Sequence, residues 1–190
     1  MATDLEGGFA DAPLDSARIF RAALTVMACP GRIDTVSGIA PPSPLSPAAA
    51  ALLLTLADHE TPVWLAGAHD CAAVRDWLAF HTGASFVSRD RASFAVGSWA
   101  ALAPLDDYRI GTVEFPDRAA TLIVEMEELV AAGTAIQGPG IETVVALGLP
   151  DETVLDFNAA RFPLGIDLFL AAGDRVAALP RSARRADKGV

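Results

Sequence analysis

The sequence predicts an α/β fold in three layers, in which a mixed β-sheet carries helices on both faces. Two observations support this class. Segments with helical periodicity alternate along the chain with short apolar segments bounded by turn residues, as is typical of layered α/β domains. The short segments are also too apolar for strands that face solvent on one side, which indicates a sheet covered on both faces.

Length and composition favour one acidic domain. The 190 residues are 52% hydrophobic, enough for a single core over residues 15–185, between an N-terminal arm (1–14) and a C-terminal tail (186–190). A net charge of −10 makes binding to nucleic acid unfavourable. The N-terminus lacks a signal-peptide core, and the apolar run 48–57 is half the roughly 20 residues that span a bilayer. We therefore expect a cytoplasmic protein without a membrane partner.

The first half of the chain alternates three predicted helices with short strands. The helices are expected over residues 17–29, 48–57 and 71–81, and the strands over 33–36, 62–66, 85–87 and 93–96. Helix-capping residues precede each helix: Asp15 or Ser16 before the first, Ser46 with Pro47 before the second, and Asp70 before the third. The second helix is apolar on every side, so we expect it to be buried.

The second half of the chain is predicted to be richer in strands. Strands are expected over residues 121–126, 134–137, 143–147, 165–171 and 175–179, and a helix is expected from residue 149 to Arg161. Gly173 and Asp174 form a turn between two apolar segments, which predicts a hairpin. Residues 38–47 and 106–118 are expected to be loops, because proline, serine or charged residues interrupt any periodic pattern.

The first strand of that hairpin carries a carboxylate. Asp167 should share a face of the strand with Phe169, opposite the face of Ile166, Leu168 and Leu170. A buried carboxylate is costly unless it is paired or hydrogen-bonded. Either Asp167 is a structural residue bonded to backbone donors or to an arginine, or it belongs to a functional site. The structural alternative is favoured, because structural networks commonly hold such residues.

Several kinds of chemistry lack the residues they need. Lys188, in the tail, is the chain's single lysine, so neither a buried pyridoxal-phosphate lysine nor a Walker loop is expected. Cys29 and Cys71 have no metal or redox spacing and suit buried thiols in a reducing compartment. The histidines, which also lack zinc-site spacing, are His59, His69 and His81. No cofactor or metal is therefore predicted.

A few polar side chains remain as candidates for binding. Arg18 and Arg21 lie one helical turn apart and could bind a phosphate or a partner carboxylate, although a solvated helix face explains them equally well. His81 lies at the edge of an apolar helical stripe, where a hydrogen-bonded boundary histidine is a simpler explanation than a catalytic one. Asp58 precedes a buried strand, and Arg181 follows the last one.

Five sequence blocks resemble a known family. They are FRAALTVMACPGRI (20–33), LLLTLADHETPVWL (52–65), FHTGASFVS (80–88), GPGIE (138–142), and FPLGIDLFL followed by ALPR (162–181). In this order and spacing they resemble the PhnH family, the H subunit of the bacterial carbon–phosphorus lyase system. The resemblance extends over about residues 15–185. His59-Glu60 and Pro139 depart from the family pattern.

The resemblance implies a fold, partners and a role. The family folds like the large domain of pyridoxal-phosphate-dependent transferases without using that cofactor. Its members form homodimers and join G, I and J subunits in a core complex. That system transfers methylphosphonate to the ribose of ATP and releases adenine, giving α-D-ribose 1-methylphosphonate 5-triphosphate. The H subunit is then non-catalytic or co-catalytic, with phosphonate or ATP as ligands within the complex. The alternative is a homodimer that binds phosphonate or a nucleotide without partner subunits.

The resemblance also selects candidate site residues. Many positions that match the family motifs have plain backbone explanations, such as a helix stop or a strand end. The matched positions without such an explanation are Arg21, Asp58, His81, Asp167 and Arg181. We expect these five residues to contact a ligand or another subunit.

Overall fold

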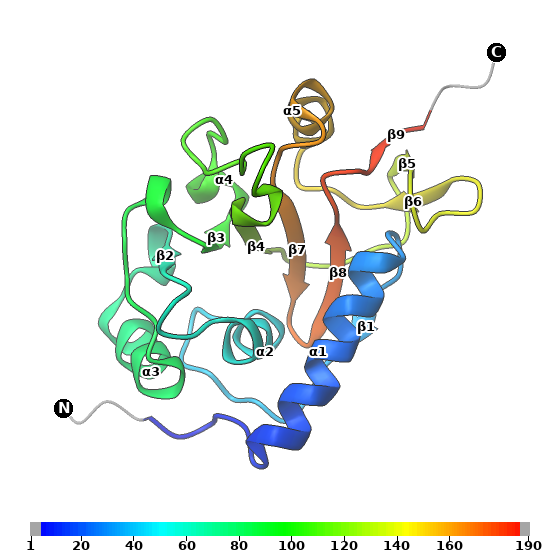
Figure 1. The fold of residues 1–190 in the computed structure, drawn as a ribbon. Helices are drawn as coiled ribbons and strands as arrows, with labels where there is room; N and C mark the ends of the chain where they lie inside the picture. The colour runs from blue at the N-terminus through cyan, green and yellow to red at the C-terminus, as the bar shows by residue number, and fades with distance from the viewer. Residues whose placement is uncertain (1–4, 187–190) are drawn as a thin grey trace.

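The structure, a computed structural model, describes residues 5–186 and is organised around a six-stranded sheet (Figure 1). The helices are α1 (Ala12–Ala28), α2 (Pro47–Leu56), α3 (Ala72–Thr82), α4 (Trp99–Leu102) and α5 (Thr153–Arg161), with 3₁₀ turns η1 (Gly67–His69), η2 (Arg89–Arg91) and η3 (Pro116–Arg118). The strands are β1 (Asp34–Thr35), β2 (Val63–Leu65), β3 (Phe94–Ser98), β4 (Thr121–Glu125), β5 (Thr134–Gln137), β6 (Val145–Leu147), β7 (Asp167–Ala172), β8 (Arg175–Leu179) and β9 (Arg184–Arg185).

The large sheet is mixed, as predicted. Its strand order is β1-β8-β7-β4-β3-β2, in which β2, β3, β4 and β7 run parallel. β8 is antiparallel to β7, and β1 is antiparallel to β8. Gly173, with φ +59°, lies in the turn between β7 and β8, which confirms the predicted hairpin.

Helices cover both faces of this sheet. Phe169 and Ala171 of β7 join a buried cluster with α1, α2 and α3. Leu168 and Leu170 join a second cluster with α4 and α5, on the opposite face. Figure 1 shows the first three helices below and to the right of the sheet and the other two above it. The predicted alternation of the hairpin strand is thus confirmed, and both of its faces are apolar because both are covered.

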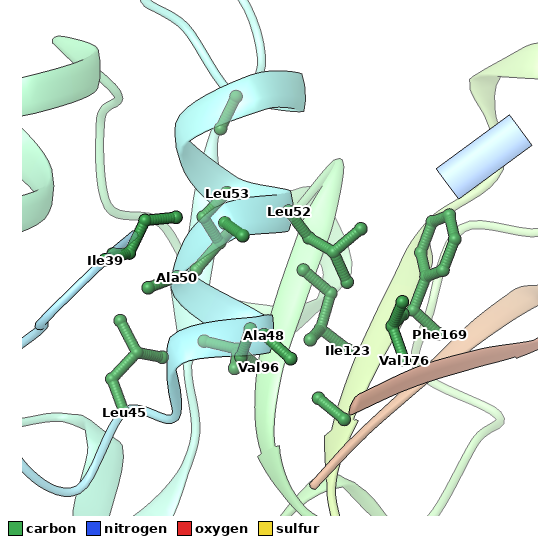
Figure 2. Packing of buried hydrophobic residues seen from close by; sticks show 14 of the residues in the cluster. Ile39, Leu45, Ala48, Ala50, Leu52, Leu53, Val96, Ile123, Phe169 and Val176 are labelled. Atoms are coloured by element: carbon green, nitrogen blue, oxygen red, sulfur yellow. The ribbon is translucent and has the colours of Figure 1, made fainter. Parts of the chain in front are cut away.

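Helix α2 is buried as predicted. Figure 2 shows Leu52 directed towards Ile123 and Phe169 of the sheet, while Ile39 and Leu45 lie on the other side of the helix. Both of these loop residues are buried. The proline- and serine-rich loop before α2 therefore packs as part of the core, which explains why the helix is apolar on every side.

Two predicted caps are wrong. Helix α1 begins at Ala12, because Asp11 accepts a hydrogen bond from the Leu14 amide at 3.3 Å, whereas Asp15 pairs with Arg18. Helix α3 begins after Cys71, which makes no side-chain cap bond. The Asp70 side chain pairs with Arg75 instead of capping α3. The Ser46 cap of α2 is confirmed by its hydrogen bond from the Ala49 amide at 3.2 Å.

Other differences lie at the sheet margins. The strand predicted over residues 85–87 is reduced to one bridge between Val63 and Phe86. The helix predicted from residue 149 begins at Thr153. A separate three-stranded sheet, with the order β6-β5-β9, includes Arg184–Arg185, which carry no strand pattern in the sequence.

Lys188 lies outside the described residues. None of the helices within residues 5–186 is long and apolar enough to cross a membrane.

Candidate functional site

Asp167 and Arg181 form one closely bonded pair. The Asp167 carboxylate accepts hydrogen bonds from the Arg181 backbone amide at 2.8 Å and from its Nε at 3.1 and 3.2 Å, and it also contacts Nη2. The Nη1 of Arg181 donates to the Pro116 carbonyl at 2.8 Å. The pair therefore joins the start of β7, the end of β8 and η3. These are the backbone and arginine contacts that the structural alternative predicts for Asp167.

Asp58 organises the turn after α2. Its carboxylate accepts hydrogen bonds from the backbone amides of Glu60 at 2.8 Å and Thr61 at 3.1 Å, and from the Thr61 hydroxyl at 3.0 Å. These bonds, led by that from the Glu60 amide, lower the pKa of the Asp58 carboxyl below its ordinary value. One oxygen of the carboxylate, Oδ1, thus accepts all three bonds that hold this local turn.

His81 holds the beginning of the described chain against α3. Its Nε2 lies 2.9 Å from the Leu5 carbonyl, and the neighbouring Trp77 indole donates to the Glu6 carbonyl at 2.8 Å. The two rings lie 4.5 Å apart. Gly8 packs so closely that a Cβ there would lie 2.4 Å from the imidazole Cε1. The contacts therefore fix residues 5–9 and give His81 the hydrogen bond expected of a boundary histidine.

A cavity of about 520 Å³ opens beside His81. We call it the α1–α3 cavity, and its lining residues are Phe9, Ala12, Pro13, Ser16, Ala17, Phe20, Leu54, Thr55 and His81. Most of the lining is apolar, and the Thr55 hydroxyl is occupied by a hydrogen bond to the Ala51 carbonyl at 2.7 Å. The cavity thus suits a largely apolar group with one or two polar atoms near Ser16 and His81.

Arg21 lies on an exposed apolar surface near this cavity. Leu14, Phe20 and Leu24 of α1 are 70%, 47% and 55% exposed. We call these three residues the α1 surface. Helical periodicity places Arg21 between Leu14 and Leu24. Within residues 5–186, no ion pair of the Arg21 guanidinium is found, whereas Arg18 pairs with Asp15 and donates to the Ser37 carbonyl.

The five predicted residues do not form one site. Arg21 lies on α1, and His81 lies on α3 beside Leu5 and Gly8. Asp58 follows α2 in a turn near the end of α3, since a Cβ at Gly83 would contact His59. Asp167 and Arg181 bond to each other and to η3. A ligand or subunit role for these residues stays a prediction.

Sequence reasoning missed a second polar pair. The Nε2 of His69, in η1 after β2, is buried and has no hydrogen-bond partner among the described residues. It lies 3.7 Å from a carboxylate oxygen of Glu125, at the end of β4, which accepts a hydrogen bond from the Ser46 amide at 2.8 Å. One feature of the sequence could have indicated this pair. His69 comes shortly after the predicted strand 62–66, and Glu125 lies near the end of the predicted strand 121–126, and the carboxyl ends of parallel strands meet at one edge of a sheet.

The described residues contain no cluster suited to a metal ion. No group of three or more histidine, cysteine, aspartate or glutamate side chains lies close enough together within residues 5–186. His69 and Glu125 supply two such side chains and no third. The sites described above are therefore defined by hydrogen bonds, ion pairs and apolar packing.

Comparison with known proteins gives two matches. A family profile described as "Bacterial phosphonate metabolism protein (PhnH)" matches residues 7–186. The chain is also 42% identical over 188 residues to a protein of Rhizobium meliloti (strain 1021) named "Alpha-D-ribose 1-methylphosphonate 5-triphosphate synthase subunit PhnH". This alignment covers 94% of each chain.

Proposed function

The chain belongs to the PhnH family, and from this premise we propose that it is the H subunit of a carbon–phosphorus lyase core complex in phosphonate catabolism. In that role it supports the transfer of methylphosphonate to the ribose of ATP, with release of adenine. The observation that carries the proposal is the 42% identity to a named synthase subunit across 94% of both chains. The family profile matches residues 7–186, a range that includes every helix and strand of the described residues.

We further propose that the chain supports the reaction rather than performing it alone. Asp58 is engaged in a turn, His81 holds residues 5–9, and Asp167 is bonded to Arg181. Structural contacts of this kind support the proposal of a supporting role. The proposal includes a fold like the large domain of pyridoxal-phosphate-dependent transferases, without that cofactor, and a cytoplasmic location.

The proposed partners are a second copy of the chain and the G, I and J subunits. The α1 surface supports this part of the proposal. It exposes three large apolar side chains on the helix that carries Arg21, and exposed apolar side chains grouped in this way mark interaction sites. Packing against another subunit would remove these side chains from water and bring Arg21 to a partner carboxylate.

Co-purification with the G, I and J subunits tests the proposal, with the mass of each assembly measured by light scattering. We expect the chain to be dimeric alone and to join a larger stoichiometric assembly. Leu24→Glu should weaken one or both associations, whereas Val113→Glu, at a 78% exposed position in the loop before η3, should change neither. A chain that stays apart while G, I and J associate with each other would refute the subunit role.

The second candidate function is binding of phosphonate or a nucleotide by the chain without partner subunits. The α1–α3 cavity, which His81 lines and whose lining residue Phe20 precedes Arg21 in the chain, favours this alternative. Calorimetry with methylphosphonate and with ATP should then give saturable heat that Arg21→Ala abolishes and Arg91→Ala preserves. The absence of heat at millimolar ligand would remove this candidate.

A further inference from the structure

A second cavity, of about 330 Å³, lies on the other side of the sheet. Its lining residues are Trp99, Ala103, Pro104, Leu105, Asp106, Asp151, Thr153 and Phe157. Trp99 directly follows β3, and Asp151 and Thr153 lie at the beginning of α5. In α/β folds with parallel strands, ligands bind outside the carboxyl ends of those strands. The cavity has both the size and the position of a small-molecule site.

The wall formed by residues 103–106 is held in place from behind. Arg89 donates hydrogen bonds to the carbonyls of Pro104 at 3.0 Å and Ala103 at 3.4 Å. The Tyr108 hydroxyl donates to the Leu102 carbonyl at 2.9 Å. Since these bonds fix the backbone of the loop, the cavity is formed before any ligand arrives, which lowers the entropic cost of binding.

The side chains at the beginning of α5 and at Phe157 are also held in place. The Asp151 carboxylate accepts a hydrogen bond from the Thr153 amide at 2.8 Å. On the other wall, the Arg161 guanidinium lies 3.8 Å from the Phe157 ring centroid and pairs with Asp106 at 2.9 Å. Phe157 therefore presents ring surface that is already oriented.

The lining selects a particular ligand chemistry. Five of the eight lining residues are apolar, and two of these are aromatic, which favours a flat ring. The charged lining residues are Asp106 and Asp151, and each carboxylate keeps acceptor capacity beyond the bonds described, because two oxygens accept about four hydrogen bonds. Arg161 pairs with Asp106 at 2.9 Å, so the two carboxylates and this guanidinium together carry a net negative charge, which favours N–H donors and disfavours anions.

We propose that this cavity binds an amino-substituted heteroaromatic ring, such as a nucleobase, with the ring against Trp99 or Phe157 and its amino group directed to Asp106 or Asp151. The proposal does not rest on the subunit role. Its failure would leave the assembly experiment unaffected, and the ring could bind to a chain that joins no complex.

The first test titrates the full-length chain with adenine, with purine, which lacks the amino group, and with benzoate, which is a flat anion. We expect saturable binding of adenine, about fivefold weaker binding of purine, and none of benzoate. Equal affinities for adenine and purine would overturn the hydrogen-bonding assignment. No saturation at millimolar adenine, or binding of benzoate in preference, would overturn the site.

A matched pair of variants locates the site. Phe157→Leu should weaken adenine binding about tenfold, because base–aromatic stacking is lost. Phe115→Leu is the control, since its ring also carries an arginine, with the Arg118 guanidinium 4.0 Å away, but lies outside the cavity. Equal effects of the two variants would overturn the location.

A measurement on the unaltered chain keeps the test decisive if Phe157→Leu does not fold. Adenine should shift the indole N–H resonance of Trp99, assigned with Trp99→Phe, and leave that of Trp77, which is buried on the other face of the sheet. Asp106→Asn, at a side chain that is 73% exposed, should fold normally and weaken binding. A shift confined to Trp77 would refute the proposal.

Discussion

Two carboxylates of similar burial lie at opposite ends of the parallel strands and have very different surroundings. Asp167, at the beginning of β7, is 21% exposed and is bonded to an arginine through its backbone and its guanidinium. Glu125, at the end of β4, is 12% exposed and lies 3.7 Å from a histidine nitrogen that has no hydrogen bond among the described residues. The first pair is complete and the second is not, so we expect opposite responses to mutation.

The largest expected effect comes from breaking the complete pair. Arg181→Leu should lower the free energy of unfolding by about 3 kcal/mol, because the Asp167 carboxylate loses its cation while remaining mostly buried. Urea denaturation measures the change. Arg185→Leu is the control, since its pair with Glu152 is 41% and 48% exposed and should contribute less than about 1 kcal/mol. Similar losses in both variants would show that burial does not distinguish the two pairs.

The second-largest effect is expected at His81, whose imidazole has a hydrogen-bond partner. His81→Leu should cost about 1 kcal/mol, because it removes the bond to the Leu5 carbonyl and the packing against Trp77. Limited proteolysis should also cut near residues 5–9 faster than in the unaltered chain. His59→Leu, at an 80% exposed side chain, is the matched control. An unchanged cleavage rate in His81→Leu would contradict the proposed attachment of this segment.

Substitution in the incomplete pair, His69 with Glu125, should not lower the stability of the fold. His69→Leu should leave the free energy of unfolding unchanged or raise it by up to about 1 kcal/mol, because it removes a buried nitrogen that lacks a partner. Thermal unfolding of His69→Leu and His81→Leu under the same conditions compares the two directly. A large loss of stability in His69→Leu would mean that the contact with Glu125 stabilises the fold after all.

The smallest effect is expected at the exposed Asp58 turn and depends on pH. The pKa of this carboxyl is lowered in the folded state, so its stabilising contribution is present above the ordinary pKa of aspartate and is lost as pH falls through the lowered value. The stability difference between the unaltered chain and Asp58→Asn should therefore disappear in acid. Unfolding curves at neutral and acidic pH measure this. A difference that persists in acid would contradict the assignment.

The same comparison separates what the sequence could predict from what it could not. The contact of Asp167 follows from local pattern, because an apolar strand, a Gly-Asp turn and a second strand bring Arg181 back beside it. The pairing of His69 with Glu125 depends on two strands that are distant in the sequence and separated in the sheet by β3. No local pattern carries that information.

The residue at which a helix starts is a second feature that the sequence alone could not predict. Asp11, Asp15 and Ser16 are all suitable caps for α1. In the structure Asp11 is the cap, and Asp15 lies within the helix, where it accepts a hydrogen bond from the Asp11 amide at 3.1 Å and pairs with Arg18. Strand β9 is a third feature that the sequence alone could not predict. Arg184 and Arg185 have no strand pattern, and they pair with β5 because the chain that leaves β8 passes beside it. Tertiary context overrides propensity at both places.

The order in which the sheet is assembled has a consequence for synthesis on the ribosome. Helix α2 is complete at residue 56, but the strands it packs against include β7 and β8, which end at residues 172 and 179 of 190. During translation, this apolar helix can pack against α1 and later against α3, but its partners in β7 and β8 become available only when nearly the whole chain has been made. The nascent chain should depend on chaperones over that interval, and a message truncated before β7 should yield an aggregating product.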